Sequence, residues 1–268
     1  MGFHTTGMSP DDLEIWLKHF EYHAERPRRI PPELADVLSP EERALIASSI
    51  ATFQLGEQSE GGTLLRAAGR FARERELPAL LRIMELFIRE EQRHASLLRS
   101  FMEDHQIPLK SSHWTDHVFR RLRRLAGLEL YLCVLITAEL IGNVYYRVLA
   151  SATGCQRLRV LCRTLVAEEL VHVAFESQLL LALRAGRLGW ARALMRSAHR
   201  AFLAGTATVV WLTHRVLLRH SGYEARTFLR LCLAQYDFYL EPVKVTLASR
   251  RSSTATLTSF RISTPSDS

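Results

Sequence analysis

Glycine, proline and lysine are scarce in this chain. Its 268 residues include 13 glycines and 9 prolines, and lysine occurs only at positions 18, 110 and 244. So few chain-breaking residues exclude a protein built of many short strands and tight turns. Leucine, alanine, arginine and glutamate dominate instead, and this composition favours helices. The sequence therefore predicts an all-α protein.

Cysteine and uninterrupted apolar runs are also rare. The four cysteines include no Cys-x-x-Cys pair, so we expect buried thiols in a reducing compartment. The longest apolar stretches, 125–150 and 201–218, are interrupted by Glu139 and His214. We therefore expect buried or amphipathic helices there and no membrane span. No basic region followed by an apolar run opens the chain, which predicts no signal peptide and a cytoplasmic protein.

Positive charge exceeds negative charge, and arginine carries nearly all of it. The formal net charge is +7. Scattered arginines on solvated helix faces are the ordinary explanation of such an excess. The densest group lacks interleaved aromatic residues and is a weak sign of nucleic-acid binding; it comprises Arg120, Arg121, Arg123 and Arg124.

Helix start and stop signals divide the chain into helical segments. Ser9 and Ser39 each precede a proline and two acids, which predicts helices over about 9–25 and from 40 to about 73. Apolar residues at helical spacing predict further helices from Pro78 to about 103 and over 125–150. A next helix carries Leu158 and ends by Leu183, and two more are predicted over about 188–219 and 223–238. The serine- and threonine-rich residues 251–268 are predicted to be a disordered tail.

One motif occurs twice. Glu90-Glu91-Gln92-Arg93-His94 is echoed 78 residues later by Glu168-Glu169-Leu170-Val171-His172. A glutamate three residues before a histidine lies on the same helical face. Carboxylate and imidazole at this spacing make half of a metal site. One Glu-x-x-His could arise by chance, whereas two in matching apolar helices indicate a shared role.

A further acid is expected to face each motif. Glu60 precedes Glu91 by 31 residues, and Glu139 precedes Glu169 by 30. In antiparallel helical hairpins, residues equidistant from the turn lie at the same height, about 22 Å from the turn at ~1.5 Å per residue. Buried carboxylates need a proton, a cationic partner or a metal. The candidate metal ligands are therefore Glu60, Glu91, His94, Glu139, Glu169 and His172.

Several neighbours leave alternatives open. Glu57 lies one turn before Glu60 on the same face and is the alternative ligand, although the repeat favours Glu60. The acids Glu90 and Glu168 are expected to be solvated or to contact ligands. For Glu176 we expect a surface position, with orientation of a ligand as the alternative. Core packing is expected of both Tyr145 and Tyr146, with a redox or hydrogen-bonding role as the alternative.

With these six ligands the sequence resembles the ferritin-like di-iron carboxylate superfamily, in a bacterial branch close to rubrerythrins and di-iron oxygenases. The resemblance covers about 40–185. It implies a ferritin-like antiparallel four-helix bundle within a single domain over 1–250, with additional helices at about 9–25 and 188–238.

The resemblance also implies an enzyme. It would be a di-iron oxidase or oxygenase that activates dioxygen or peroxide to oxidise a small organic substrate, with manganese as the alternative metal and no catalytic residue beyond the ligands. An external electron donor is needed, because the chain has no cysteine-rich redox module. The alternatives are ferroxidase or rubrerythrin-like iron handling or peroxide scavenging, a tRNA-modifying di-iron hydroxylase, and a helical interaction protein with a degenerate site. The oligomeric state stays open, a homodimer included.

Overall fold

The computed structural model describes residues 8–58, 61–111 and 127–240, and these residues form helices and no strand. The all-α prediction is confirmed. The helices are α1 (Pro10–Glu25), α2 (Pro40–Glu57), α3 (Gly62–Glu74), α4 (Pro78–Asp104), α6 (Leu128–Ser151), α7 (Gln156–Arg184), α8 (Gly189–His220) and α9 (Ala225–Leu240). The arginine cluster at 120–124 and the predicted tail lie outside the described residues.

The two serine caps predicted from the sequence are present. Ser9 accepts a hydrogen bond from the backbone N–H of Asp12, and the Asp12 carboxylate accepts one from the Ser9 backbone. Ser39 and Glu42 make the same reciprocal pair at the start of α2. Each serine cap contributes about 1 kcal/mol by satisfying backbone N–H groups at the helix start.

The helix predicted from 40 to about 73 is in fact two helices. α2 ends at Glu57 and α3 begins at Gly62. Gly61 lies between them in the left-handed region with φ of 67°, where a side chain would be strained. A Cβ at this position would also lie 2.5 Å from the side chain of Ile88 on α4. The break therefore needs glycine, and it places Glu57 at the very end of α2.

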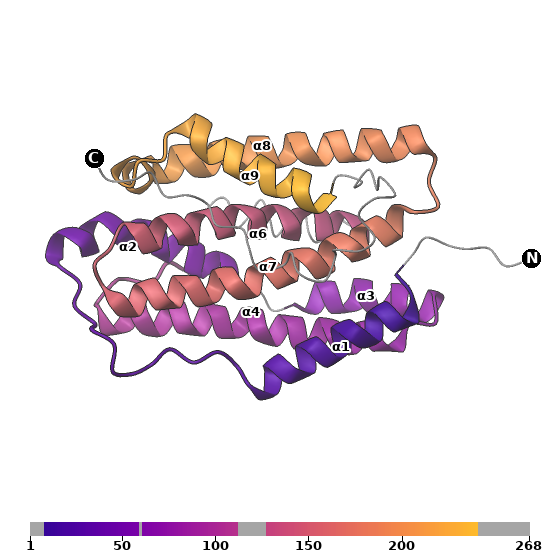
Figure 1. The fold of residues 1–268 in the computed structure, drawn as a ribbon, viewed down its shortest axis with the longest axis horizontal. Helices are drawn as coiled ribbons and strands as arrows, with labels where there is room; N and C mark the ends of the chain where they lie inside the picture. The colour runs from indigo at the N-terminus through magenta and orange to yellow at the C-terminus, as the bar shows by residue number, and fades with distance from the viewer. Residues whose placement is uncertain (1–7, 59–60, 112–126, 241–268) are drawn as a thin grey trace, which may run out of the picture.

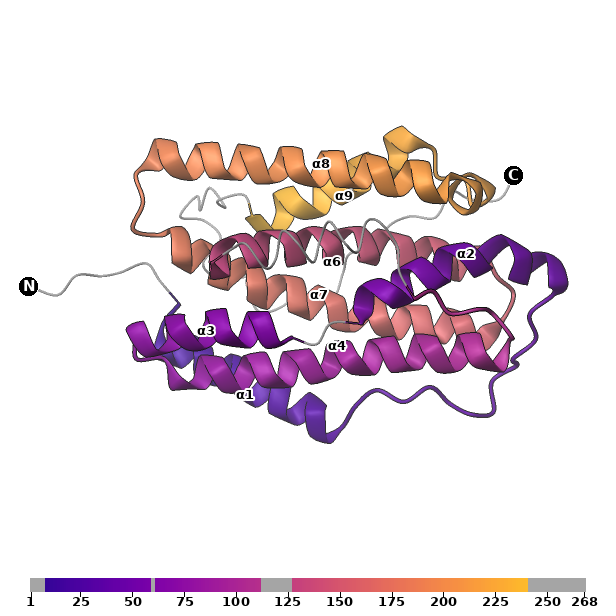
Figure 2. The ribbon, with the colours of Figure 1, turned by 180° about the vertical axis from the view of Figure 1, so that it is seen from behind.

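The helices pack in layers (Figure 1). α6 and α7 lie side by side in the middle, α8 and α9 cover α6 on one side, and α1, α3 and α4 lie on the other. Seen from behind, α2 and α3 follow one another along α4 (Figure 2). The α2–α3 pair, α4, α6 and α7 therefore enclose a common interior.

The buried apolar side chains form two clusters with a gap between them. On α4 the first cluster ends at Ile88 and the second begins at Leu98. On α7 the second cluster ends at Val166 and the first resumes at Val173. Each gap contains one of the two Glu-x-x-His pairs: Glu91 with His94 on α4, and Glu169 with His172 on α7. The polar residues singled out in the sequence therefore lie between two apolar cores, shielded by each.

Two helices, α6 and α8, are long and apolar enough to cross a membrane. α6 is enclosed by its neighbours, with 83% of its most apolar window buried, which confirms a buried helix there. In α8 only 33% of the corresponding window is buried, and Trp190, Leu194, Leu212 and Val216 are exposed. For α8, the absence of a membrane span stays a prediction.

Candidate metal centre

Four helical segments bring carboxylates and imidazoles to one place between the apolar cores. They form two groups of four, in each of which one ligand atom per residue lies within 4.8 Å of the others. Glu91 and Glu169 belong to both groups. The first group is Glu57, Glu91, His94 and Glu169, and the second is Glu91, Glu139, Glu169 and His172.

Five of the six ligands predicted from the sequence lie in these groups, and the sixth, Glu60, lies outside the described residues. Glu57, the alternative at that position, occupies the corresponding place in the first group. The spacing argument for Glu60 assumed a continuous helix from 40 to 73, and the break before Gly61 removes that assumption. The sequence signal for Glu57 was its place one turn after Phe53 on the apolar face of α2.

The cluster is deeply buried. His94 and His172 have no exposed surface, and Glu91, Glu139 and Glu169 are at most 7% exposed. Within the described residues, no arginine or lysine pairs with any of these three acids. Several buried carboxylates without a cationic side chain are strongly unfavourable unless protons or a metal neutralise them.

Atoms facing the centre of the cluster lack hydrogen bonds. In the part of the chain that the structure describes, the Nδ1 atoms of His94 and His172, Oε1 of Glu91 and both carboxylate oxygens of Glu139 are buried without a hydrogen-bond partner. His94 Nδ1 lies 3.0 Å from Glu169 Oε1, and His172 Nδ1 lies 3.0 Å from Glu91 Oε1. Such convergence without hydrogen-bond geometry fits cation binding, and this oxygen and nitrogen donor set suits divalent iron or manganese.

The outward nitrogen of each histidine contacts an acid on the other motif. His94 Nε2 lies 2.9 Å from Glu168 Oε2, and His172 Nε2 lies 3.1 Å from Glu90 Oε2. Histidines that bind metals commonly donate their other N–H to a carboxylate, which fixes the ring and increases its basicity. Of the two expectations for Glu90 and Glu168, the structure therefore supports contact with the ligands.

Arg93 connects the two outer acids. Its guanidinium donates to Glu168 and lies 3.4 Å from Glu90, and Arg28 lies 3.9 Å from Glu168. The arginine thus compensates the outer carboxylates, so they do not need a metal. Arg93 is one of the two residues between Glu91 and His94, a position for which the repeated motif predicts no role.

The pKa values of the cluster describe its metal-free state. Burial, reinforced by nearby carboxylates, raises the pKa of Glu57 and of Glu139 well above the usual range. Burial alone would lower the pKa of His94 and of His172, but the surrounding glutamate carboxylates, which bond the outward Nε2 atoms and lie close to the Nδ1 atoms, raise both well above the usual value. Protons therefore neutralise the metal-free cluster, and a bound cation would replace them.

Two neighbours of the ligands differ from the simplest expectation. Glu176 is 1% exposed and lies against Glu139, so its expected surface position is wrong. Tyr146 is buried in the second apolar cluster, as expected for core packing, and its hydroxyl also donates a hydrogen bond to Glu57, which is the alternative considered for it. Tyr145 instead stacks on Phe53 with ring centroids 3.4 Å apart, as expected for core packing.

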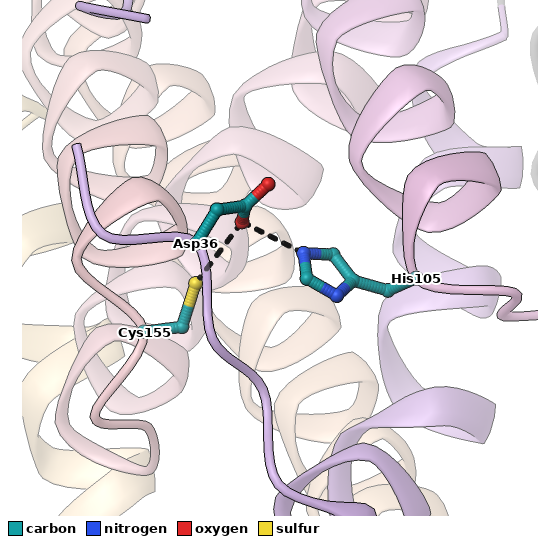
Figure 3. Close-up of side chains that lie close together, drawn as sticks. All are labelled: Asp36, His105 and Cys155. Atoms are coloured by element: carbon teal, nitrogen blue, oxygen red, sulfur yellow. Dashed lines mark hydrogen bonds and ion pairs between the residues drawn. The ribbon is translucent and has the colours of Figure 1, made fainter. Parts of the chain in front are cut away.

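A separate group joins Asp36, His105 and Cys155 (Figure 3). Asp36 Oδ1 lies 2.7 Å from His105 Nε2 and 3.5 Å from Cys155 Sγ. The second Asp36 oxygen accepts a hydrogen bond from Arg157. Burial raises the pKa of the Cys155 thiol, and the Asp36 carboxylate adds to this rise, so the sulfur stays protonated. We therefore interpret the group as a structural junction between the segment before α2, α4 and α7.

No family model, curated protein or solved structure matches this chain. The site itself is therefore the basis for inferring what the protein does. Its two buried groups of carboxylates and imidazoles, which share Glu91 and Glu169, could hold metal ions.

Proposed function

We propose that this protein is a ferritin-like di-iron enzyme that activates dioxygen or peroxide to oxidise a small organic substrate. The observation that carries this proposal is the sharing of Glu91 and Glu169 by two four-residue groups. A single metal site would not need a second set of ligands beyond the shared pair. The helices α2–α3, α4, α6 and α7 would then be the four rods of the ferritin-like bundle.

Each residue has a role in this proposal. Glu91 and Glu169 would hold both ions, Glu57 and His94 would complete one site, and Glu139 and His172 the other. Iron bound to oxygen and nitrogen ligands supplies electrons to dioxygen or peroxide, and an external donor must restore them. Manganese is the alternative metal for the same ligands.

The surrounding residues would orient the ligands and exclude water. Glu168 and Glu90 hold the outward nitrogens of the two histidines. Phe87 and Phe20 pack on the ring of His172, with centroids 4.6 Å and 6.0 Å away. Phe20 comes from α1, so the N-terminal helix covers the histidine side of the centre.

Anaerobic titration with Fe(II) tests the proposal. We expect the purified protein to bind two irons per chain and then to consume dioxygen when it is admitted. Glu139→Ala should bind fewer than two irons while its far-ultraviolet circular dichroism stays helical. Two irons in the variant would contradict the ligand assignment, and no iron in the wild type would contradict the proposed function.

The iron titration, together with assays of peroxide turnover and tRNA binding, separates the alternative functions. Uptake of many irons per chain would indicate iron storage, and rapid turnover of hydrogen peroxide without an organic substrate would indicate peroxide scavenging. Salt-sensitive binding of tRNA would favour the tRNA-modifying hydroxylase. Wild-type protein that never binds metal would indicate a helical interaction protein with a degenerate site.

A further inference from the structure

A cavity of about 150 Å³ adjoins the candidate metal centre within the described part of the chain. Glu57, Glu91, Glu139 and Glu169 all contribute to its wall, whereas neither ligand histidine does. The ligand set is therefore asymmetric, with histidines and their outer acids on one side and carboxylates facing the cavity. A molecule in the cavity would meet the centre from the carboxylate side.

The rest of the wall is mostly apolar. Phe53, Phe87, Val134, Ile141 and Val210 come from four helices, α2, α4, α6 and α8, and supply aromatic and branched aliphatic surface. An apolar cavity of about 150 Å³ is large enough to hold a benzene ring. The space therefore fits a single ring or a short aliphatic chain, and it would strip water from a charged substrate at a high cost.

Away from the carboxylates, α8 supplies three polar residues of the wall, Thr206, Thr213 and His214, and Thr52 on α2 and Tyr146 on α6 supply two more. The helix loses regular geometry at His214, whose φ is −108° and ψ is 15°. Thr213 donates to the Val209 carbonyl, a bond that bends helices, and His214 Nδ1 lies 2.9 Å from the Ser49 hydroxyl. The hydrogen bond to Ser49 fixes the imidazole at this wall. Thr213 is exposed, so the polar part reaches solvent.

We propose that this cavity binds a small, mostly apolar substrate, a single aromatic ring or short aliphatic chain with one hydroxyl or carbonyl group. The apolar body lies toward the carboxylates, and the polar group lies at α8 near Thr213 and His214. Oxidation is therefore directed to the apolar end of the molecule. This inference rests on the proposed function, because an occupant is a substrate only if metal ions are bound beside it.

Calorimetric titration of the metal-free protein with toluene and with p-cresol tests the cavity. Ala138 on α6 lines the cavity and is exposed, so Ala138→Phe fills the space without overpacking the core. We expect this variant to bind both probes at least tenfold more weakly than the wild type. Ala201→Phe, the same change on an exposed part of α8 outside the cavity, should bind both as the wild type does. Absent probe binding, or equal binding by Ala138→Phe, overturns the proposal.

A second variant tests the polar group. Thr213→Val removes one hydroxyl from the wall. It should weaken the binding of p-cresol about three- to tenfold, the effect of one hydrogen bond, while the binding of toluene stays unchanged. Equal effects on both probes, or none, overturn the orientation. The Fe(II) titration is done in parallel. Iron binding without probe binding rejects the cavity but not the di-iron site, and probe binding without iron rejects the di-iron function and the substrate role with it.

Discussion

Replacing Glu139 with methionine should stabilise the metal-free protein and remove metal binding at one of the two sites. Glu139 is 5% exposed, and among the described residues no N–H or hydroxyl group donates to its oxygens, whose hydrogen-bonding neighbour is another acid, Glu176. An unpartnered buried polar group costs about 1–3 kcal/mol in protein variants. Methionine has a similar shape without that cost, so we expect the free energy of unfolding to rise by about 1–3 kcal/mol.

Urea denaturation followed by circular dichroism, with a chelator present, measures this change. Added Fe(II) in the absence of chelator should then reverse the order of stability, because an ion at 1,000 times its Kd contributes about 4.1 kcal/mol per site and the variant loses one site. The wild type should gain from both ions and the variant from one at most. A variant stabilised by iron as much as the wild type would contradict the role of Glu139 as a ligand.

Glu129→Met on the same helix is the matched control. The Glu129 carboxylate pairs with Arg184 at 2.8 Å, and the Arg184 side chain is only 7% exposed. Removing one partner of a buried pair costs about 3–5 kcal/mol, so this variant should be less stable with or without metal. If Glu139→Met destabilises the metal-free protein in the same way, Glu139 has a structural partner and the reasoning is refuted.

Three further predictions follow from the site and its surroundings. Glu57→Gln should weaken the binding of one of the two irons at least tenfold in a calorimetric titration, whereas Glu60→Gln should leave the binding of both unchanged. The reverse result would identify Glu60 as the ligand. Glu168→Gln should lower the affinity of the site containing His94 about 10- to 100-fold in a chelator competition, through loss of the charged acceptor, and unchanged affinity would exclude that role. Burial lowers the pKa of His199 from 6.5 to about 4. The unfolded chain therefore takes up this proton first, so stability present above pH 6.5 falls by about 3 kcal/mol as the pH drops to 4. His199→Gln should flatten this part of the stability profile in urea titrations at successive pH values, and an unchanged slope would show that another group is responsible.

The parts of the site that repeat along the sequence could be predicted from it. Glu91 with His94 and Glu169 with His172 recur in matching apolar helices, and a helical period fixes their common face regardless of distant packing. Glu139 could also be predicted, because it is the single acid in the apolar run at the centre of its helix. Their convergence needed only the assumption of antiparallel hairpins.

The rest depended on backbone and packing details that no period encodes. The break before Gly61 arises from a left-handed glycine against Ile88, a contact between helices that residue spacing does not reveal. It undid the register argument that had favoured Glu60 over Glu57. Burial of Glu176 likewise depends on how α7 faces Glu139, and a lone acid one turn past a motif resembles a surface residue in sequence.

The crossed contacts of the two outer acids have a consequence for the origin of the chain. Each half of the repeat supplies the carboxylate that contacts the outward Nε2 atom of the other half's histidine. Neither hairpin therefore supplies this carboxylate to its own histidine. Two identical hairpins associating about a twofold axis would make the same exchange. Duplication and fusion of one ancestral hairpin accounts for both the 78-residue echo and the crossing. A single half expressed alone should therefore assemble this arrangement only by pairing with another copy of itself.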